Sequence, residues 1–284
     1  MSIDLHTHSN VSDGTDTPAE LVRNAKAAGL STVALTDHDT FDGLDEAVAE
    51  GERIGIEVLR GMELSCQNRQ FGQGKGMSIH LLMYGGDEQF AELHEEMARV
   101  REGRTNRLRP VLDKLAELGA PVTEEAVLAK VGDSPSVGRP HIADALVEAG
   151  HVQDRKEAFD RFLADGGPAH VERYTIDVAH GIDLVTAAGG VPVIAHPWGR
   201  GREAALPPDY LQMLVSDHGL AGIEVDHQDH DAETRERLRK LADQLGVLIT
   251  GSSDYHGTGK VDHDLGVNTT SPQALAEIKG RIRA

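Results

Sequence analysis

Short β-like runs alternate with longer helical runs along most of this 284-residue chain, and this alternation is the feature that most constrains its fold. Such a pattern is typical of βα units wound around a mainly parallel sheet. Thr17 and Pro18 predict a helix over 18–28 that Gly29 ends, and a second helix is predicted over 44–54. The predicted strands lie at about 3–5, 33–35, 57–59, 79–83, 191–194, 222–225 and 247–250.

The central part of the sequence, residues 91–174, is poor in strand patterns and rich in helix-forming residues. This predicts a helical insertion subdomain over 91–174, with 1–90 and 175–284 forming one discontinuous main domain. The alternative is that these helices decorate a single connection of a barrel. Helices are expected near 88–118, 124–130, 140–149 and 156–163, where short apolar stripes can pack against one another.

The charge balance restricts the partners of the chain. With 28 Lys and Arg against 47 Asp and Glu, the formal net charge of −19 repels long DNA or RNA, which bind through many cationic contacts to phosphates. A small phosphorylated substrate or a short RNA end stays compatible where positive charge gathers locally. No apolar run approaches the roughly 20 residues that span a bilayer. The single cysteine, Cys66, favours a reducing cytoplasm, and we expect no secretory signal.

Histidines and carboxylates stand beside every predicted strand. Since the C-terminal ends of parallel barrel strands meet at one mouth, we expect these side chains to converge there and to form a metal site. The residues are His6, His8 and Asp13 after the first strand, Asp37-His38-Asp39 after the second, Gly61-Met62-Glu63 after the third, His80 at the start of the fourth, His196 after the fifth, Asp226 and His227 after the sixth, and Asp254 and His256 after the seventh.

His6 and His8 form the most informative pair. Alternation along an extended segment puts both imidazoles on one face, where they can hold the same ion. A lone histidine after a strand is more often a surface or hydrogen-bonded residue, and His38 between Asp37 and Asp39 could form a solvated turn. Carboxylates next to a ligating histidine are also its usual outer partners. The combination across seven strands favours a metal cluster.

In their order, these motifs resemble the polymerase and histidinol phosphatase family, known as PHP. The resemblance implies an α/β fold, a distorted (β/α)7 barrel, with two to three divalent ions of manganese, iron or zinc. The motifs that carry it are His6-Thr7-His8 with Asp13, Thr36-Asp37-His38-Asp39, Gly61-Met62-Glu63, His80, His196-Pro197 and Asp254-Tyr255-His256.

The resemblance also implies a division of the ligands among three ions. Glu63 would bridge the first ion to the second, and Asp13 stands where some relatives have histidine, so that its harder oxygen shifts the preference toward manganese or iron. The first group is His6, His8, Glu63 and Asp254, the second is Glu63, His80 and His196, and the third is Asp13, His38 and His256.

Residues 136–146 resemble a bacterial branch of the family that has a helical insert. That branch contains phosphatases that remove the 3′-phosphate of nucleoside 3′,5′-bisphosphates and 5′-to-3′ exoribonucleases that trim short RNA. Pro140 predicts that Arg139 lies at a helix start, where free amides and its guanidinium favour a phosphate that is not cleaved. Arg139 could instead be an ordinary exposed residue, and Arg200 is a second candidate for substrate binding. The arginines of the preceding helix, Arg101, Arg104, Arg107 and Arg109, are interpreted as a solvated face.

These features predict a metal-dependent phosphoesterase. We expect metal-bound hydroxide to attack the substrate directly, because no catalytic residue outside the metal cluster is identifiable. The first choice of reaction removes the 3′-phosphate of a nucleoside 3′,5′-bisphosphate and leaves an AMP-type 5′-mononucleotide. Exonuclease action on short RNA and hydrolysis of histidinol phosphate are the alternatives. A metal-dependent amidohydrolase is disfavoured by Glu63 at the bridging position, and a non-catalytic metal-binding module by the complete set of motifs.

Overall fold

The computed structural model describes residues 2–69, 71–74, 76–132 and 134–283, and a single mixed sheet lies at its centre. The seven predicted strands are all present, but the third continues eight residues beyond its predicted end at 59, to Gln67. A two-residue strand, β5, is added beside β3. In sheet order they are β1 (Ser2–Asp4), β2 (Leu30–Leu35), β3 (Glu57–Gln67), β4 (Ser78–Tyr84), β6 (Val191–Ala195), β7 (Gly222–Asp226) and β8 (Leu248–Gly251), and β5 is Ile176–Asp177.

Strand β4 runs against both of its neighbours, whereas the other neighbouring strands of the path are parallel. In the register, His80 pairs with Ser65 of β3 and with Ala195 of β6. The beginning of β4 therefore lies at the edge where its parallel neighbours end. This orientation explains why a residue at the start of the fourth strand can join residues that follow the other strands.

The two ends of the sheet, β1 and β8, meet outside their strands. Among the described residues they share no ladder, but an isolated parallel bridge joins Thr7 to Tyr255, and the Tyr255 carbonyl accepts a hydrogen bond of 2.8 Å from the His8 amide. The α/β architecture fits the distorted (β/α)7 barrel that the family resemblance implies, with a seam between β1 and β8 that no strand ladder closes in the described chain.

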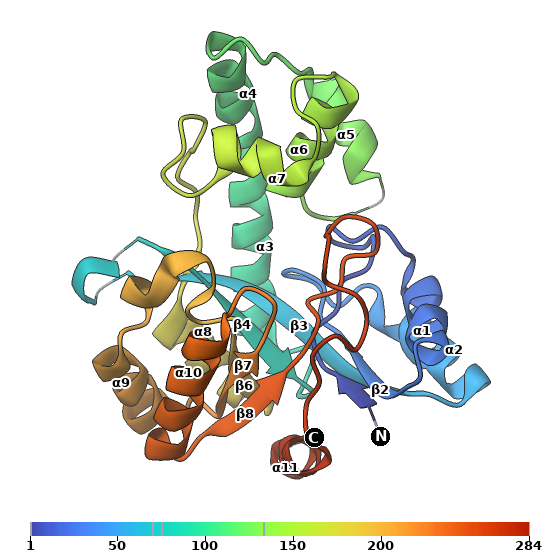
Figure 1. Ribbon diagram of the computed structural model, residues 1–284, viewed down its shortest axis with the longest axis vertical. Coiled ribbons are helices and arrows are strands. Elements are labelled where there is room, and N and C mark those ends of the chain that lie inside the picture. The colour runs from blue at the N-terminus through green and yellow to red at the C-terminus, as the bar shows by residue number, and fades with distance from the viewer. Residues whose placement is uncertain (1, 70, 75, 133, 284) are drawn as a thin grey trace.

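Helices cover the outside of the sheet, with α1 and α2 on one side and α8, α9 and α10 on the other (Figure 1). Thr17 and Glu20 form a capping box at the start of α1, where Thr17 and Pro18 predict a helix start, and Gly55 ends α2 with a φ of 72°. The bounds are α1 (Pro18–Ala27), α2 (Leu44–Ile54), α8 (Val178–Ala187), α9 (Pro208–His218), α10 (Ala232–Leu245) and α11 (Pro272–Arg281), with short turns η1 (Gly72–Gly74) and η3 (Gly199–Ala205).

The remaining helices stand above the sheet, and the long α3 connects them to it (Figure 1). The single helix predicted over 88–118 is wrong: α3 ends at Asn106 and α4 begins at Leu108, because Pro110 cannot donate a backbone hydrogen bond and would clash with the carbonyl of residue 106 in a continuous helix. These elements are α3 (Ala91–Asn106), α4 (Leu108–Glu117), α5 (Glu124–Val131), α6 (Arg139–Glu148), α7 (Arg155–Ala158) and the π-helical turn η2 (Phe159–Leu163).

Two of the apolar cores divide at the break between α3 and α4. Leu93, Met97 and Val100 of α3 pack in the core of the sheet, whereas Leu112 and Leu146 belong to a separate core between α4 and η2. The separate core runs from Leu108 to Ala169, and the helical insertion over 91–174 remains a prediction. No helix among the described residues is long and apolar enough to cross a membrane.

Candidate metal centre

His6 and His8 leave β1 with both side chains fully buried and directed at one point. Their Nε2 atoms lie 3.0 Å apart. Glu63 Oε2 lies 3.3 Å and 3.1 Å from these two nitrogens, and Asp254 Oδ1 lies 3.6 Å from each of them. The structure thus brings together the four residues of the first group.

The spacing of these atoms fits a shared cation. A metal that holds ligands at about 2.1 Å in octahedral geometry places adjacent ligand atoms about 3 Å apart. Two imidazole nitrogens that face each other at 3.0 Å between two carboxylates match this arrangement. The donor set of nitrogens and oxygens also suits manganese, iron or zinc.

Glu63 connects the first group to the second. Its Oε1 lies 2.9 Å from His80 Nδ1 and 3.4 Å from His196 Nε2, while its Oε2 faces the first group. Each oxygen can therefore serve a different ion. The sequence suggested that Glu63 follows its strand, and this is wrong. Strand β3 continues to Gln67 and carries Glu63 in its middle.

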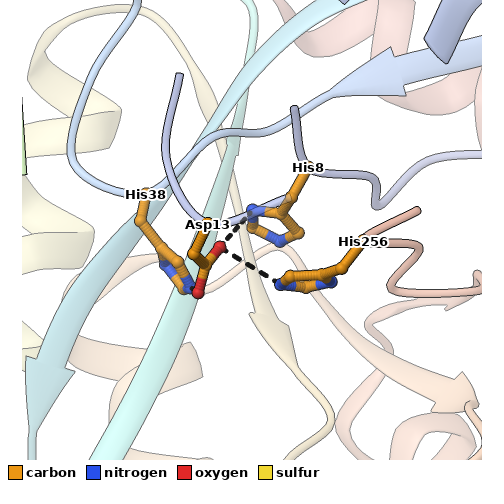
Figure 2. Close-up of side chains that lie close together, drawn as sticks. All are labelled: His8, Asp13, His38 and His256. Carbon is orange, nitrogen blue, oxygen red and sulfur yellow. Dashed lines mark ion pairs between the residues drawn. The ribbon is translucent and has the colours of Figure 1, made fainter. Parts of the chain in front are cut away.

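The third group gathers around Asp13 (Figure 2). Asp13 Oδ1 lies 3.2 Å from His256 Nε2, and Asp13 Oδ2 lies 3.8 Å from His38 Nε2. The other ring nitrogen of His38 lies 3.1 Å from Glu63 Oε2, but without hydrogen-bond geometry. His8 also turns its Nδ1 toward Asp13 Oδ1, at 3.9 Å. All nine predicted ligands therefore meet in one place, and their role as ligands stands as our proposal.

The protonation of the centre suits cation binding. Burial raises the pKa values of Glu63 and Asp254, but neighbouring histidines, together with Lys260 beside Asp254, bring both well below their ordinary values. Burial lowers the pKa of His196 to about 3. Ionised carboxylates beside neutral imidazoles are the forms that ligate metals.

His6 is the exception to this pattern. Burial lowers its pKa, but Glu63, Asp254 and Glu224 raise it well above its ordinary value. A positive charge is therefore favoured at the point where the first group converges, and a bound cation would supply it.

Glu224 in the middle of β7 contacts two of the proposed ligands, and sequence reasoning did not single it out. Its Oε2 accepts a hydrogen bond of 2.9 Å from the His196 amide, and its Oε1 lies 3.4 Å from His6 Nδ1. The sequence signal was a glutamate between Ile223 and Val225, a charged residue inside an apolar run, and the structure shows it fully buried. The sequence pointed instead to Asp226, which faces outward and pairs with Arg239 at 2.8 Å.

The carboxylates beside His38 do not hold its ring, contrary to the interpretation that they are its outer partners. Asp37 accepts hydrogen bonds from the Ser9 amide at 2.8 Å and from Ser12 Oγ at 2.6 Å, so it fixes the loop that carries Asp13. Asp39 instead accepts from the Ser65 amide at 2.7 Å.

Lys260 and His227 lie at the outer side of Asp254. The Lys260 ammonium forms an ion pair with Asp254, and His227 Nε2 lies 3.3 Å from the same Oδ2 atom. No sequence pattern marks Lys260, because it lies in an irregular loop after β8.

Asp39, His196 and Asp254 all have positive φ values, of 55°, 28° and 54°, and such backbone strain is common at functional sites.

The two predicted substrate-binding arginines, Arg139 and Arg200, are each paired with a carboxylate of the protein. Arg139 begins α6 as predicted, but its guanidinium is already paired with Asp165 at 2.6 Å and with the Leu163 carbonyl at 3.0 Å. Arg200 is half exposed and pairs with Asp229 at 2.9 Å. Whether either of them contacts substrate stays a prediction.

The helix face interpreted as solvated is mostly buried, so that interpretation is wrong for three of its four arginines. Arg104 donates to Asp39 at 2.8 Å and to Ser65 at 2.6 Å, and Arg101 donates to the Asp39 carbonyl at 2.6 Å. Arg107 is only 8% exposed. Arg109 alone is largely exposed, where it pairs with Asp113. The difference arises because α3 connects the barrel to the upper helices and turns Arg101 and Arg104 toward Asp39.

Comparison with known proteins agrees with this geometry. The sequence profile described as "PHP domain" matches residues 4–134. The chain is 32% identical to a 3′,5′-nucleoside bisphosphate phosphatase of Chromobacterium violaceum over 288 residues, covering 100% of this chain and 97% of that protein. A 5′-3′ exoribonuclease of Haemophilus influenzae is 31% identical, with 89% of each chain covered.

Two further proteins are similar over nearly their whole length. A phosphoribosyl 1,2-cyclic phosphate 1,2-diphosphodiesterase of Eggerthella lenta is 32% identical, covering 93% of this chain and 97% of that protein. A crystal structure from Bifidobacterium adolescentis, provisionally assigned as a metal-dependent phosphoesterase, superposes with a TM-score of 0.91 at 35% identity, covering 99% of this chain and 96% of that one.

Proposed function

Because the chain belongs to the PHP family of metal-dependent phosphoesterases, we propose that it removes the 3′-phosphate of nucleoside 3′,5′-bisphosphates and leaves a 5′-mononucleotide. The observation that carries the proposal is a group of five arginines, two of them buried and three half-buried, next to the candidate metal centre. The substrate has two phosphates, and the site offers two different places for anions.

This arginine cluster contains two carboxylates, Asp39 beside Arg104 and Asp165 beside Arg139 and Arg202. Arg139 lies 2.6 Å and Arg202 lies 3.7 Å from the carboxylate oxygens of Asp165. Within the described part of the chain, no carboxylate lies within ion-pair distance of Arg107 or Arg173. The cluster consists of Arg104, Arg107, Arg139, Arg173 and Arg202.

The arginine cluster carries more positive than negative charge, because Asp39 and Asp165 stand beside five arginines. Burial and the charges of nearby arginines lower the pKa of Arg107 well below its ordinary value and that of Arg173 to about 9. Guanidinium groups keep their proton in proteins, so these shifts express a cost of holding the charges together. A phosphate with two negative charges would relieve that cost through bidentate hydrogen bonds.

Arg104 connects the arginine cluster to the metal centre. Its guanidinium donates to Asp39, next to His38, and to Ser65, which pairs with His80 in the sheet. The charge of Arg104 also contributes to lowering the pKa of His38, after burial. In the proposed binding mode, one small substrate spans both regions, with its 3′-phosphate at the centre and its 5′-phosphate at the arginines.

Bound divalent ions at this centre would supply an activated water and neutralise the charge on the phosphoryl group. The protein residues would bind and orient the substrate around that reaction. The arginine cluster fixes the phosphate that stays on the product, and Glu224 holds His6 and the His196 backbone in place. Two or three ions fit the nine ligands, and Asp13 favours manganese or iron.

The test is hydrolysis of adenosine 3′,5′-bisphosphate by the manganese-loaded protein. We expect release of one phosphate and formation of AMP, with activity lost in His38→Ala. Preferential cleavage of histidinol phosphate, or no phosphate release from the bisphosphate under any of the three metals, would overturn the proposal.

Exonuclease action on short RNA is the second candidate, because the arginine cluster could equally hold the 5′-phosphate of an RNA end. A 5′-phosphorylated dinucleotide and a long RNA separate the two activities. We expect the net charge of −19 to disfavour the long RNA. Faster cleavage of the dinucleotide than of the bisphosphate would make the exonuclease the principal activity.

A further inference from the structure

Arg155, at the start of α7, is held rigidly by a residue of the preceding helix. Its Nε donates to Asp144 Oδ1 at 2.6 Å and its Nη2 donates to Asp144 Oδ2 at 2.7 Å. Only 17% of the Arg155 side chain is exposed. Because a bidentate pair fixes the plane of the guanidinium, the remaining nitrogen, Nη1, has a defined direction.

Nη1 of Arg155 reaches out of the upper helices to two loops of the barrel. It donates to the Asp13 carbonyl at 3.2 Å and lies 3.4 Å from the Gly259 carbonyl. A Cβ atom at position 259 would lie 2.3 Å from Nη1, so glycine is required for this approach. Gly259 precedes Lys260, which contacts the ligand Asp254. Arg155 therefore joins the loop of the third group to the loop that follows β8.

The Asp13 loop is held from its other side by the barrel. Asp37 binds Ser9 and Ser12, and the amides of Ser12 and Gly14 donate to the Ser9 carbonyl. A side chain at Gly14 would collide with the His8 carbonyl, 2.3 Å away. Asp13 thus lies between the loop that Asp37 fixes and the contact from Arg155 of the helical segment.

We propose that Arg155, oriented by Asp144, is a positioning residue that sets the affinity of the third group for its metal ion. The pair lies outside the nine ligands and outside the arginine cluster. It acts through the backbone of Asp13, whose carboxylate must face both His38 and His256. The inference rests on the proposed metal centre but not on the identity of the substrate.

The experiment compares manganese binding by wild type, Arg155→Ala and Arg155→Lys. After gel filtration in limiting manganese, we expect Arg155→Ala to retain one ion fewer per chain than wild type by elemental analysis. The manganese concentration for half-maximal activity should rise roughly 10–100-fold, the usual effect of losing an outer partner of a metal ligand. Saturating manganese should restore most of kcat with little change in KM, and Arg155→Lys should fall between the two.

Lys156→Ala is the matched control, because Lys156 is the next residue of the same helix and its pair with Asp160 is exposed. It should bind manganese as wild type does. If Arg155→Ala does not fold, Asp144→Asn replaces it and should weaken manganese binding in the same direction. A wild-type manganese titration in the variant that folds overturns the inference. Since metal content is measured without substrate, failure on the bisphosphate would leave this result interpretable.

Discussion

The Nε2 atoms of His6 and His8 lie 3.0 Å apart, between the carboxylates of Glu63 and Asp254. Two imidazole nitrogens can both turn their lone pairs to the same point when a cation stands between them. Because these four side chains come from the segment after β1, from β3 and from the loop after β8, we expect the stability of the fold to depend on metal occupancy.

Removal of metal should destabilise the protein. We expect chelator-treated protein to unfold at a lower temperature than the manganese-loaded form, because only the folded chain assembles the ligands. At a manganese concentration of about 100 times Kd, a single site contributes roughly 2.7 kcal/mol. Thermal unfolding followed by circular dichroism, with and without chelator, measures the difference. Equal midpoints would contradict a metal-linked fold.

Loss of Glu224 should weaken metal binding without altering the ligands themselves. Glu224→Gln keeps the size of the side chain but removes the charge that faces His6 Nδ1. We expect the manganese requirement for activity to rise roughly 10–100-fold. Asp226→Asn, a change on the same strand at an outward-facing residue, is the control and should leave the manganese requirement unchanged.

The arginine cluster should recognise the phosphate that is not cleaved. We expect Arg173→Ala to raise KM for adenosine 3′,5′-bisphosphate roughly tenfold or more, because a charged hydrogen bond contributes about 1.5–3 kcal/mol. Adenosine 3′-monophosphate lacks the second phosphate, so its kcat/KM should change little. Arg109→Ala removes an exposed arginine and should leave both substrates unaffected. An equal loss on both substrates would place Arg173 outside the 5′-phosphate site.

Asp165 should compete with phosphate for Arg139 and Arg202. Burial raises its pKa, but these two arginines bring the pKa well below its ordinary value, so the carboxylate stays charged at every working pH. We expect Asp165→Asn to lower the unfolding temperature in phosphate-free buffer. Added inorganic phosphate should then stabilise the variant more than it stabilises wild type. If phosphate stabilises both proteins equally, Asp165 does not occupy the anion site.

Glu50 should add stability that disappears in acid. Hydrogen bonds from Arg53 and Arg23 lower its pKa from 4.5 to about 2 in the folded protein. The contribution is therefore complete above about 4.5, the value for the unfolded chain, and is lost as the pH falls toward 2. We expect the difference in unfolding temperature between wild type and Glu50→Gln to shrink over this interval. A constant difference across the interval would argue against the ion pairs.

Much of the fold and the candidate site follows from local patterns in the sequence. Thr17 with Glu20 and the glycine at position 55 mark helix ends through backbone chemistry that needs no tertiary contact. His6 and His8 share a face because of strand alternation alone. The ligand positions could be anticipated because most of them follow a strand, where parallel neighbours bring their ends together.

Other features depend on packing that no local pattern records. Glu224 and Lys260 gain their roles only from the residues that face them. Arg107 looks solvated on a helix considered alone, yet in the fold it is buried among other arginines. The reversed direction of β4 could not be predicted either, since apolar alternation is the same for a strand read from either end.

The loose seam between β1 and β8 gives the metal centre a second consequence. Thr7 and Tyr255 supply the one isolated bridge across this seam in the described chain, while the ligands His6 and His8 come from one side of it and Asp254 and His256 from the other. Ions held by these residues would complete the wall of the barrel where the backbone ladder is missing. The rate at which the seam opens would then depend on the rate at which the metal dissociates. Amide hydrogen exchange in β1 and β8 measures this opening.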